Sequence, residues 1–110
     1  MNRVWPVLLL GVIGCGDEDA AFCKDVPVIT WESYGQDYIQ HHCLSCHAED
    51  TPDRNGAPQT LLLDTHTQIQ QHKERILEVL TSDPPTMPPF GGVDADEQWQ
   101  AEVWLRCFEP

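Results

Sequence analysis

The stretch Cys43-Leu44-Ser45-Cys46-His47 decides how this sequence of 110 residues is interpreted. Its two cysteines stand three positions apart, and a histidine follows the second one directly. On a helix, positions i and i+3 lie on one face and position i+4 lies beside the first. The two thiols and the imidazole therefore point in one direction if this stretch is helical.

This spacing is typical of covalent haem attachment, in which the two thiols add to the two vinyl groups of one porphyrin and the imidazole is aimed at the iron. The expected cofactor is one haem c, bound by Cys43 and Cys46 with His47 as an iron ligand. A thioredoxin-like dithiol would need a strand before the helix in a βαβ unit. A zinc site would need four ligands, commonly with a separated second half. Both are weaker alternatives, as is coincidence.

Met87 is the predicted second iron ligand, because it is the only methionine left once Met1 is removed with a signal peptide. It stands in Pro84-Pro85-Thr86-Met87-Pro88-Pro89-Phe90, where the prolines fix φ and remove N–H donors. The alternatives are that Met87 only fills the core, or that a histidine is the ligand. His66 and His72 are the rival ligands, but their polar neighbours predict that both face solvent.

The first 14 residues have the layout of a signal peptide: a positive start followed by about ten apolar residues, too few for a membrane span of about 20. The ending Val12-Ile13-Gly14-Cys15 resembles a bacterial lipoprotein signal, which implies cleavage before Cys15 and lipidation of that cysteine. An ordinary secretory signal or an uncleaved apolar tail is the alternative. Residues 15–29 are expected to form a solvated, lipid-anchored tether and lead-in on the periplasmic side of a membrane, and residues 30–110 one domain.

The net charge of −12 excludes nucleic acid as an expected partner, since that binding depends on clustered Lys and Arg. Removal of residues 1–14 removes Arg3 and no acid, so the mature charge becomes −13. An acidic surface favours encounters with a partner protein that has a basic face, although it can equally serve only solubility.

Five cysteines in a chain of this length indicate an oxidising compartment. With Cys15 assigned to lipid and two cysteines to haem, Cys23 and Cys107 remain as a pair. A disulfide between them is the favoured prediction, and two free buried thiols are the alternative.

Three helices are predicted, and no segment alternates with the period of a strand. The first covers about residues 31–46, with Thr30 as its N-cap and Ser33 following. The second covers about residues 67–80. The third begins after Asp94, which forms a capping-box pattern with Glu97. The linkers 49–59 and 82–93 are predicted to be loops.

The order helix, Cys-x-x-Cys-His, loop, helix, Met in a proline-rich loop and aromatic helix resembles the class I monohaem cytochrome c family over about residues 30–108. The resemblance implies an all-α fold of three main helices with long loops around the haem. It implies that the first and last helices cross beside the haem, with Cys23 brought near Cys107. Pro58 is the implied acceptor of the proximal imidazole N–H. The crossing would gather aromatic residues: Tyr34, Tyr38, Trp99 and Trp104.

Histidine and methionine ligation favours ferrous iron and leaves no open position for a substrate, so one-electron transfer is expected and enzyme activity is not. A haem enzyme or subunit, or a haem sensor with a labile sixth ligand, is the alternative. Arg75 and Lys73 are candidate partners of the haem propionates. A thin core is expected to close on the haem through apolar side chains: Ile39, Leu61, Leu63, Ile76, Leu80, Phe90, Trp99 and Trp104.

Overall fold

The computed structural model describes residues 16–89 and 91–110, and within these ranges the chain is helical with no strand. The predicted all-α class is therefore confirmed. The predicted signal peptide, the predicted lipidation site Cys15 and Phe90 lie outside the described residues. In the described part, no helix has both the length and the apolar character needed to cross a bilayer. The elements are α1 (Gly16–Phe22), η1 (Trp31–Gly35), α2 (Gln36–His42), α3 (Leu44–His47), α4 (His66–Gln71), α5 (Lys73–Thr81), α6 (Ala95–Val103) and η2 (Trp104–Phe108), with η marking π-helical turns.

The first predicted helix begins where expected but consists of three pieces, η1, α2 and α3. Thr30 caps η1 in a reciprocal capping box, in which the Thr30 hydroxyl accepts from the Ser33 N–H and the Thr30 N–H donates to the Ser33 hydroxyl. The prediction of one continuous helix is wrong at Cys43, whose φ of −122° interrupts the regular backbone. The Cys43 carbonyl then accepts from the His47 N–H at 2.9 Å and starts α3.

The second and third predicted helices also differ from expectation in detail. Thr65 and Gln68 form a capping box that starts α4 at His66, and His72 separates α4 from α5. Asp94 caps α6 as predicted, because its carboxylate accepts from the Glu97 N–H at 2.8 Å. The return bond of that capping box, from the Asp94 N–H to the Glu97 side chain, is not among the caps of α6. The Glu97 carboxylate lies 2.8 Å from Nε2 of His42 instead.

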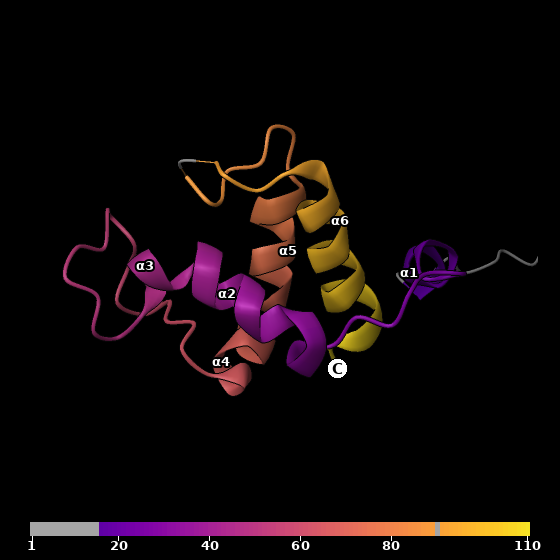
Figure 1. Cartoon of the computed structure of the whole chain (residues 1–110), viewed down its shortest axis with the longest axis horizontal. Helices are drawn as coiled ribbons and strands as arrows, with labels where there is room; N and C mark the ends of the chain where they lie inside the picture. The colour runs from indigo at the N-terminus through magenta and orange to yellow at the C-terminus, as the bar shows by residue number, and fades with distance from the viewer. Residues whose placement is uncertain (1–15, 90) are drawn as a thin grey trace, which may run out of the picture.

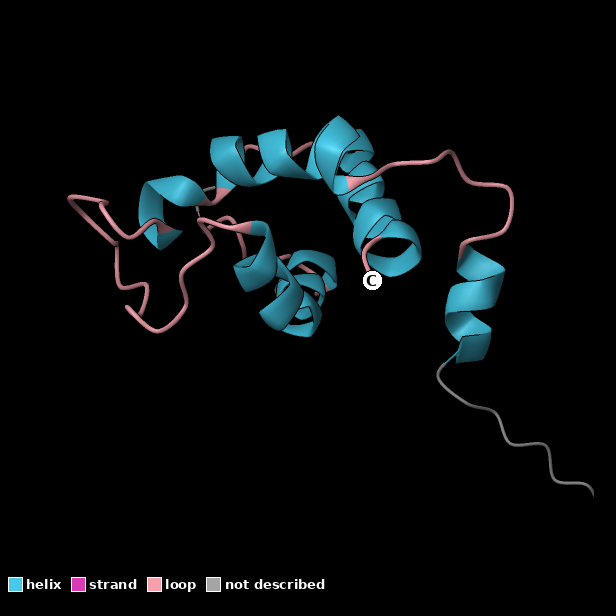
Figure 2. Cartoon of the chain, turned by 90° about the horizontal axis from the view of Figure 1, so that it is seen from below, coloured by secondary structure: helices cyan, strands magenta, loops and turns pink. Residues whose placement is uncertain are grey.

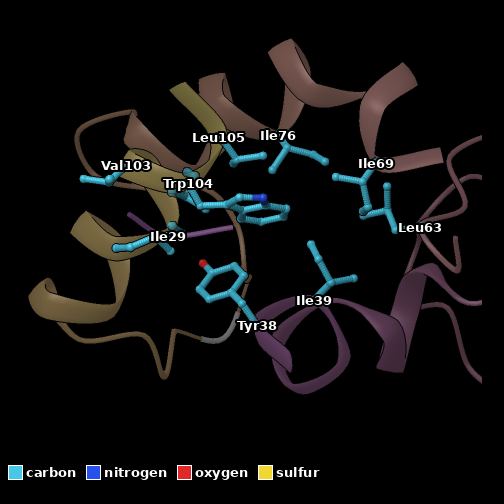
Figure 3. Close-up of a cluster of buried hydrophobic side chains, with 11 residues drawn as sticks. Ile29, Tyr38, Ile39, Leu63, Ile69, Ile76, Val103, Trp104 and Leu105 are labelled. Atoms are coloured by element: carbon cyan, nitrogen blue, oxygen red, sulfur yellow. The ribbon is translucent and has the colours of Figure 1, made fainter. Parts of the chain in front are cut away.

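The first and last helical segments cross at Gly35, as the resemblance implied. A Cβ atom at Gly35 would overlap Cε2 and Cζ2 of the Trp104 ring, so only glycine permits this approach. Trp104 is completely buried at the centre of the core, between side chains of the first helical segment and of α5 (Figure 3). Tyr34 strengthens the crossing by donating its hydroxyl hydrogen to the Glu97 carbonyl at 3.1 Å.

A buried carboxylate ties the end of the chain to α4. The Glu109 side chain is 1% exposed. It lies 2.8 Å from Nε2 of His66 and accepts from the Trp104 indole N–H at 3.2 Å. The His66 ring also stacks on Trp31 with centroids 4.6 Å apart. The expectation that His66 faces solvent is therefore wrong, because a buried acceptor and an aromatic surface hold its ring against the domain.

The expected tether begins as a helix rather than as solvated chain, because α1 is attached to the end of the domain. Cys23 and Cys107 form the predicted disulfide, with Cα atoms 5.6 Å apart. Arg106 adds an ion pair to Asp19 at 2.9 Å and lies over the Phe22 ring at 3.9 Å. In Figures 1 and 2, α1 and α3 lie at opposite ends of the molecule, with α5 and α6 between them.

Replacing Gly35 with alanine is expected to destabilise the protein, although alanine is the better helix former by about 0.5–1 kcal/mol. The added methyl group must displace the Trp104 ring, and overpacking of this kind typically costs about 1–3 kcal/mol. Urea unfolding measures the loss. The matched control, Gln36→Ala at the next and exposed position, should stay within about 0.5 kcal/mol of the parent. A Gly35→Ala protein at least as stable as the parent would contradict the close crossing.

Candidate functional site

A cavity of about 430 Å³ lies between residues 43–47, which we call the attachment segment, and α5. This volume is within the range of about 300–1,000 Å³ that is usual for small-molecule and cofactor sites. Its walls come from α2, α3, the loop after α3, α5 and the proline-rich loop. The lining residues include Tyr38, His41, His42, Cys43, Ser45, Cys46, His47, Arg54, Asn55, Gly56, Ala57, Pro58, Leu61, Leu63, Arg75, Ile76, Val79, Leu80, Met87, Pro88, Pro89 and Gly91.

The attachment segment brings both thiols and the imidazole to this cavity, as its spacing predicted. The one-turn helix α3 follows directly on Cys43, so Cys43, Cys46 and His47 all line the same space. Neither cysteine is in a disulfide. Nδ1 of His47 lies 2.9 Å from the Leu61 carbonyl oxygen, which can only accept, so Nδ1 carries the hydrogen. Nε2 is then left as the nitrogen that can bind a metal.

The acceptor of the imidazole hydrogen is Leu61, and the expectation of Pro58 is therefore wrong. Pro58 lines the cavity without this bond, and its carbonyl accepts instead from the Leu61 N–H at 3.1 Å. A second backbone bond, from the Leu63 N–H to the His47 carbonyl at 2.8 Å, fixes the segment after the loop against α3. The longer loop thus places the acceptor three residues beyond the position that the family pattern implied.

Met87 lies at the same cavity, on the loop that follows α5. The Thr86 and Met87 N–H groups both donate to the Val79 carbonyl, at 3.0 and 3.4 Å, and so attach the loop to the last turn of α5. The Met87 side chain remains 39% exposed and lines the cavity, which is unlike a methionine that fills a core. Among the lining side chains in the described ranges, Met87 is the only thioether. Neither His66 nor His72 lines the cavity.

The charges around the cavity are opposite to those of the whole chain. The chain has 18 acidic and six basic residues. None of the described Asp and Glu side chains lines the cavity, whereas two arginines, Arg54 and Arg75, do. The site therefore suits an apolar group that carries negative charge.

Two polar atoms give an independent indication of the kind of group that the cavity fits. In the described part of the chain, the Tyr38 hydroxyl and Nη1 of Arg54 are the buried side-chain N and O atoms without a hydrogen-bond partner. Both side chains line the cavity. Because unsatisfied buried polar groups are rare in folded proteins, their position points to a bound group that supplies acceptors. Together with two thiols, one imidazole and one thioether, these atoms fit a haem.

Other predicted residues lie elsewhere. Trp104 is in the core and Trp99 is 42% exposed on α6, so neither reaches the cavity and their assignment to the haem site is wrong. Lys73 donates to the Glu109 carbonyl at 2.6 Å, because that end of α5 faces the chain terminus. Phe90 is outside the described residues. Sequence reasoning missed Arg54, although it is the only cation among many acids between α3 and α4.

The environment of Cys43 is unlike that of a reactive dithiol. Burial, with a smaller contribution from Cys46, raises the pKa of the Cys43 thiol to about 12. Redox-active Cys-x-x-Cys pairs instead have a thiol whose pKa is depressed. In the ranges that the structure describes, there is also no group of three or more His, Cys, Asp or Glu side chains placed to hold one metal ion.

Comparison with protein-family models, with curated proteins and with solved structures finds no match to this chain. The residues themselves therefore carry the functional argument.

The two tyrosines should titrate far above the ordinary pKa of 10.0. Burial raises the pKa of Tyr34 to about 12, helped by the carboxylates of Glu97 and Asp94, and burial raises the pKa of Tyr38 further. Between pH 10 and about 12 the folded protein keeps phenol protons that the unfolded chain loses. The stability that the buried phenols contribute is therefore complete below pH 10 and is lost as the pH rises through this window.

Ultraviolet difference absorbance of tyrosinate against pH measures this, with a Tyr34→Phe variant to separate the two residues. The result expected is no tyrosinate near pH 10 in the folded protein, and its appearance together with unfolding at higher pH. Half-ionisation of either tyrosine at pH 10 in the folded state would contradict the buried arrangement.

Proposed function

We propose that this protein is an exported, monohaem c-type cytochrome that transfers single electrons and has no enzymatic activity of its own. The observation that carries the proposal is the convergence of Cys43, Cys46, His47 and Met87 on one cavity from two separate segments. Two thiols and one imidazole could occur together for other reasons. The haem interpretation also requires a second iron ligand. The Met87 thioether lines the same cavity from a loop some 40 positions away.

Each residue has a separate part in holding the group. Cys43 and Cys46 would attach the porphyrin covalently, and His47, whose Nδ1 hydrogen is held by the Leu61 carbonyl, would offer Nε2 to the iron. Met87 would supply a second ligand from a loop whose backbone donates to the Val79 carbonyl. Haem iron, when bound, exchanges one electron between its ferric and ferrous states. The backbone bonds from Met87 to Val79 and from Leu63 to His47 would help to hold both ligand segments in place during electron transfer.

If His47 and Met87 both bind the iron, no position is left for a substrate, which argues against the other haem functions. A peroxidase-like enzyme or a gas sensor needs an open or labile sixth position. The rival ligands expected from the sequence, His66 and His72, do not line the cavity. His41 and His42 do line it, from the helix that leads into Cys43, and Nε2 of His42 already lies 2.8 Å from the Glu97 carboxylate. An oxidoreductase complex that uses this protein as its electron-carrying subunit is compatible with the same site.

Lipid anchoring at Cys15 and a periplasmic location complete the proposal. The first described residue, Gly16, begins α1, which the disulfide and Arg106 hold at one end of the molecule. The attachment helix α3 lies at the other end (Figures 1 and 2). This arrangement supports a carrier whose haem-attachment residues lie away from the anchored end. The acidic chain as a whole suits a partner protein with a basic face.

Replacing Met87 tests the proposal most simply. The purified parent should show a methionine-to-ferric charge-transfer band and form no carbon monoxide adduct when reduced. Met87→Ala should lose that band, bind carbon monoxide readily and have a lower reduction potential, because a thioether favours ferrous iron. Met87→His should again prevent carbon monoxide binding, but its reduction potential should stay below that of the parent.

Pro89→Ala is the matched control, because it changes a neighbouring side chain of the same cavity that has no donor atom. It should keep the spectrum and the potential of the parent. If Met87→Ala keeps an unaltered spectrum and potential, Met87 is not the ligand and the carrier proposal fails.

A further inference from the structure

The loop between α3 and α4 contains a tight turn that directs one cation to the cavity. Its sequence is Pro52-Asp53-Arg54-Asn55-Gly56. The Asp53 carboxylate accepts from the Asn55 N–H at 3.0 Å, and the Ala57 N–H donates to the Arg54 carbonyl at 2.9 Å. Asn55 and Gly56 follow with φ values of 49° and 89°, the left-handed region that Asn and Gly tolerate best. Arg54 stands at the start of this turn and its side chain lines the cavity.

The Arg54 guanidinium is only half satisfied by the protein. Nη2 donates to the Glu49 carbonyl at 2.9 Å. Nη1 is buried without a partner, and in the described ranges no carboxylate forms an ion pair with Arg54. A buried donor left without an acceptor destabilises a folded protein, and a charged donor does so more. A planar guanidinium in this state is suited to an incoming carboxylate.

Arg75, the other arginine at the cavity, is placed differently. Its side chain is 61% exposed and already pairs with Glu78 one turn further along α5. Its charge is therefore offset by a neighbour and screened by water. The two arginines share the same cavity and the same charge, but only Arg54 has a buried donor without a partner.

We infer that Arg54 binds an ionised carboxylate of the group in this cavity, in place of the sequence candidates Arg75 and Lys73. The inference rests on the proposed function, because the two propionates of haem are the carboxylates in question. Arg54 would then join the bound group to the Glu49 carbonyl, so that the loop of residues 49–60 closes on its ligand. Its positive charge would offset a carboxylate that otherwise stabilises ferric iron.

The experiment compares Arg54→Gln with Arg75→Gln in the haem-loaded protein, since each removes one positive charge from the lining of the same cavity. The readouts are the resonance Raman bending band of the propionates and the reduction potential. Arg54→Gln should shift the Raman band and lower the potential. Arg75→Gln should leave the band in place and change the potential less. Arg54→Lys, which keeps the charge but not the planar fork, should shift the band while keeping most of the potential.

Two results would overturn the inference: an unshifted Raman band in both Arg54 variants, or an equal or larger shift in Arg75→Gln. The Arg54→Lys protein keeps the test decisive if the glutamine variant fails to accumulate. The methionine charge-transfer band, recorded in the same samples, separates this inference from the proposed function. With that band present and the Raman band unmoved, only the assignment of Arg54 fails. Without haem in the parent protein, the proposed function fails first.

Discussion

The structure depends on one local arrangement, the single helical turn that presents two thiols and an imidazole to the same cavity. The break at Cys43 ends α2 and lets α3 begin, while the Leu61 carbonyl fixes which nitrogen of His47 is free. The crossing of Gly35 and Trp104 holds the preceding helix against the end of the chain. The direction in which α3 presents its side chains is thus set by a core that continues into the cavity wall, where Tyr38, Ile76 and Leu80 belong to both.

The sequence predicted the features that local patterns determine. The caps at Thr30 and Asp94, the absence of strands from the described residues, and the shared face of the attachment segment follow from propensity and spacing. Met87 could be placed at the cavity because the chain offers so few thioethers. Its flanking prolines leave the loop few alternatives.

Features that depend on distant parts of the chain were not predictable in the same way. The Glu97 carboxylate leaves its expected capping bond for His42, 55 positions away. His66 was expected in solvent, but the Glu109 carboxylate and the Trp31 ring hold it. The helix α1 exists where a tether was expected, because a disulfide and Arg106 offset its acidic, polar composition. Such pairings are set by tertiary packing, which a local pattern does not contain.

Whether the cavity holds one covalently attached haem can be measured by intact mass analysis of the natively purified protein together with its absorption spectrum. We expect a single species heavier than the polypeptide of residues 15–110 by one haem and a lipid modification, with the spectrum of a c-type cytochrome and without free thiols at Cys43 and Cys46. An iron-free, colourless protein in which both of these thiols react with a thiol reagent would contradict it.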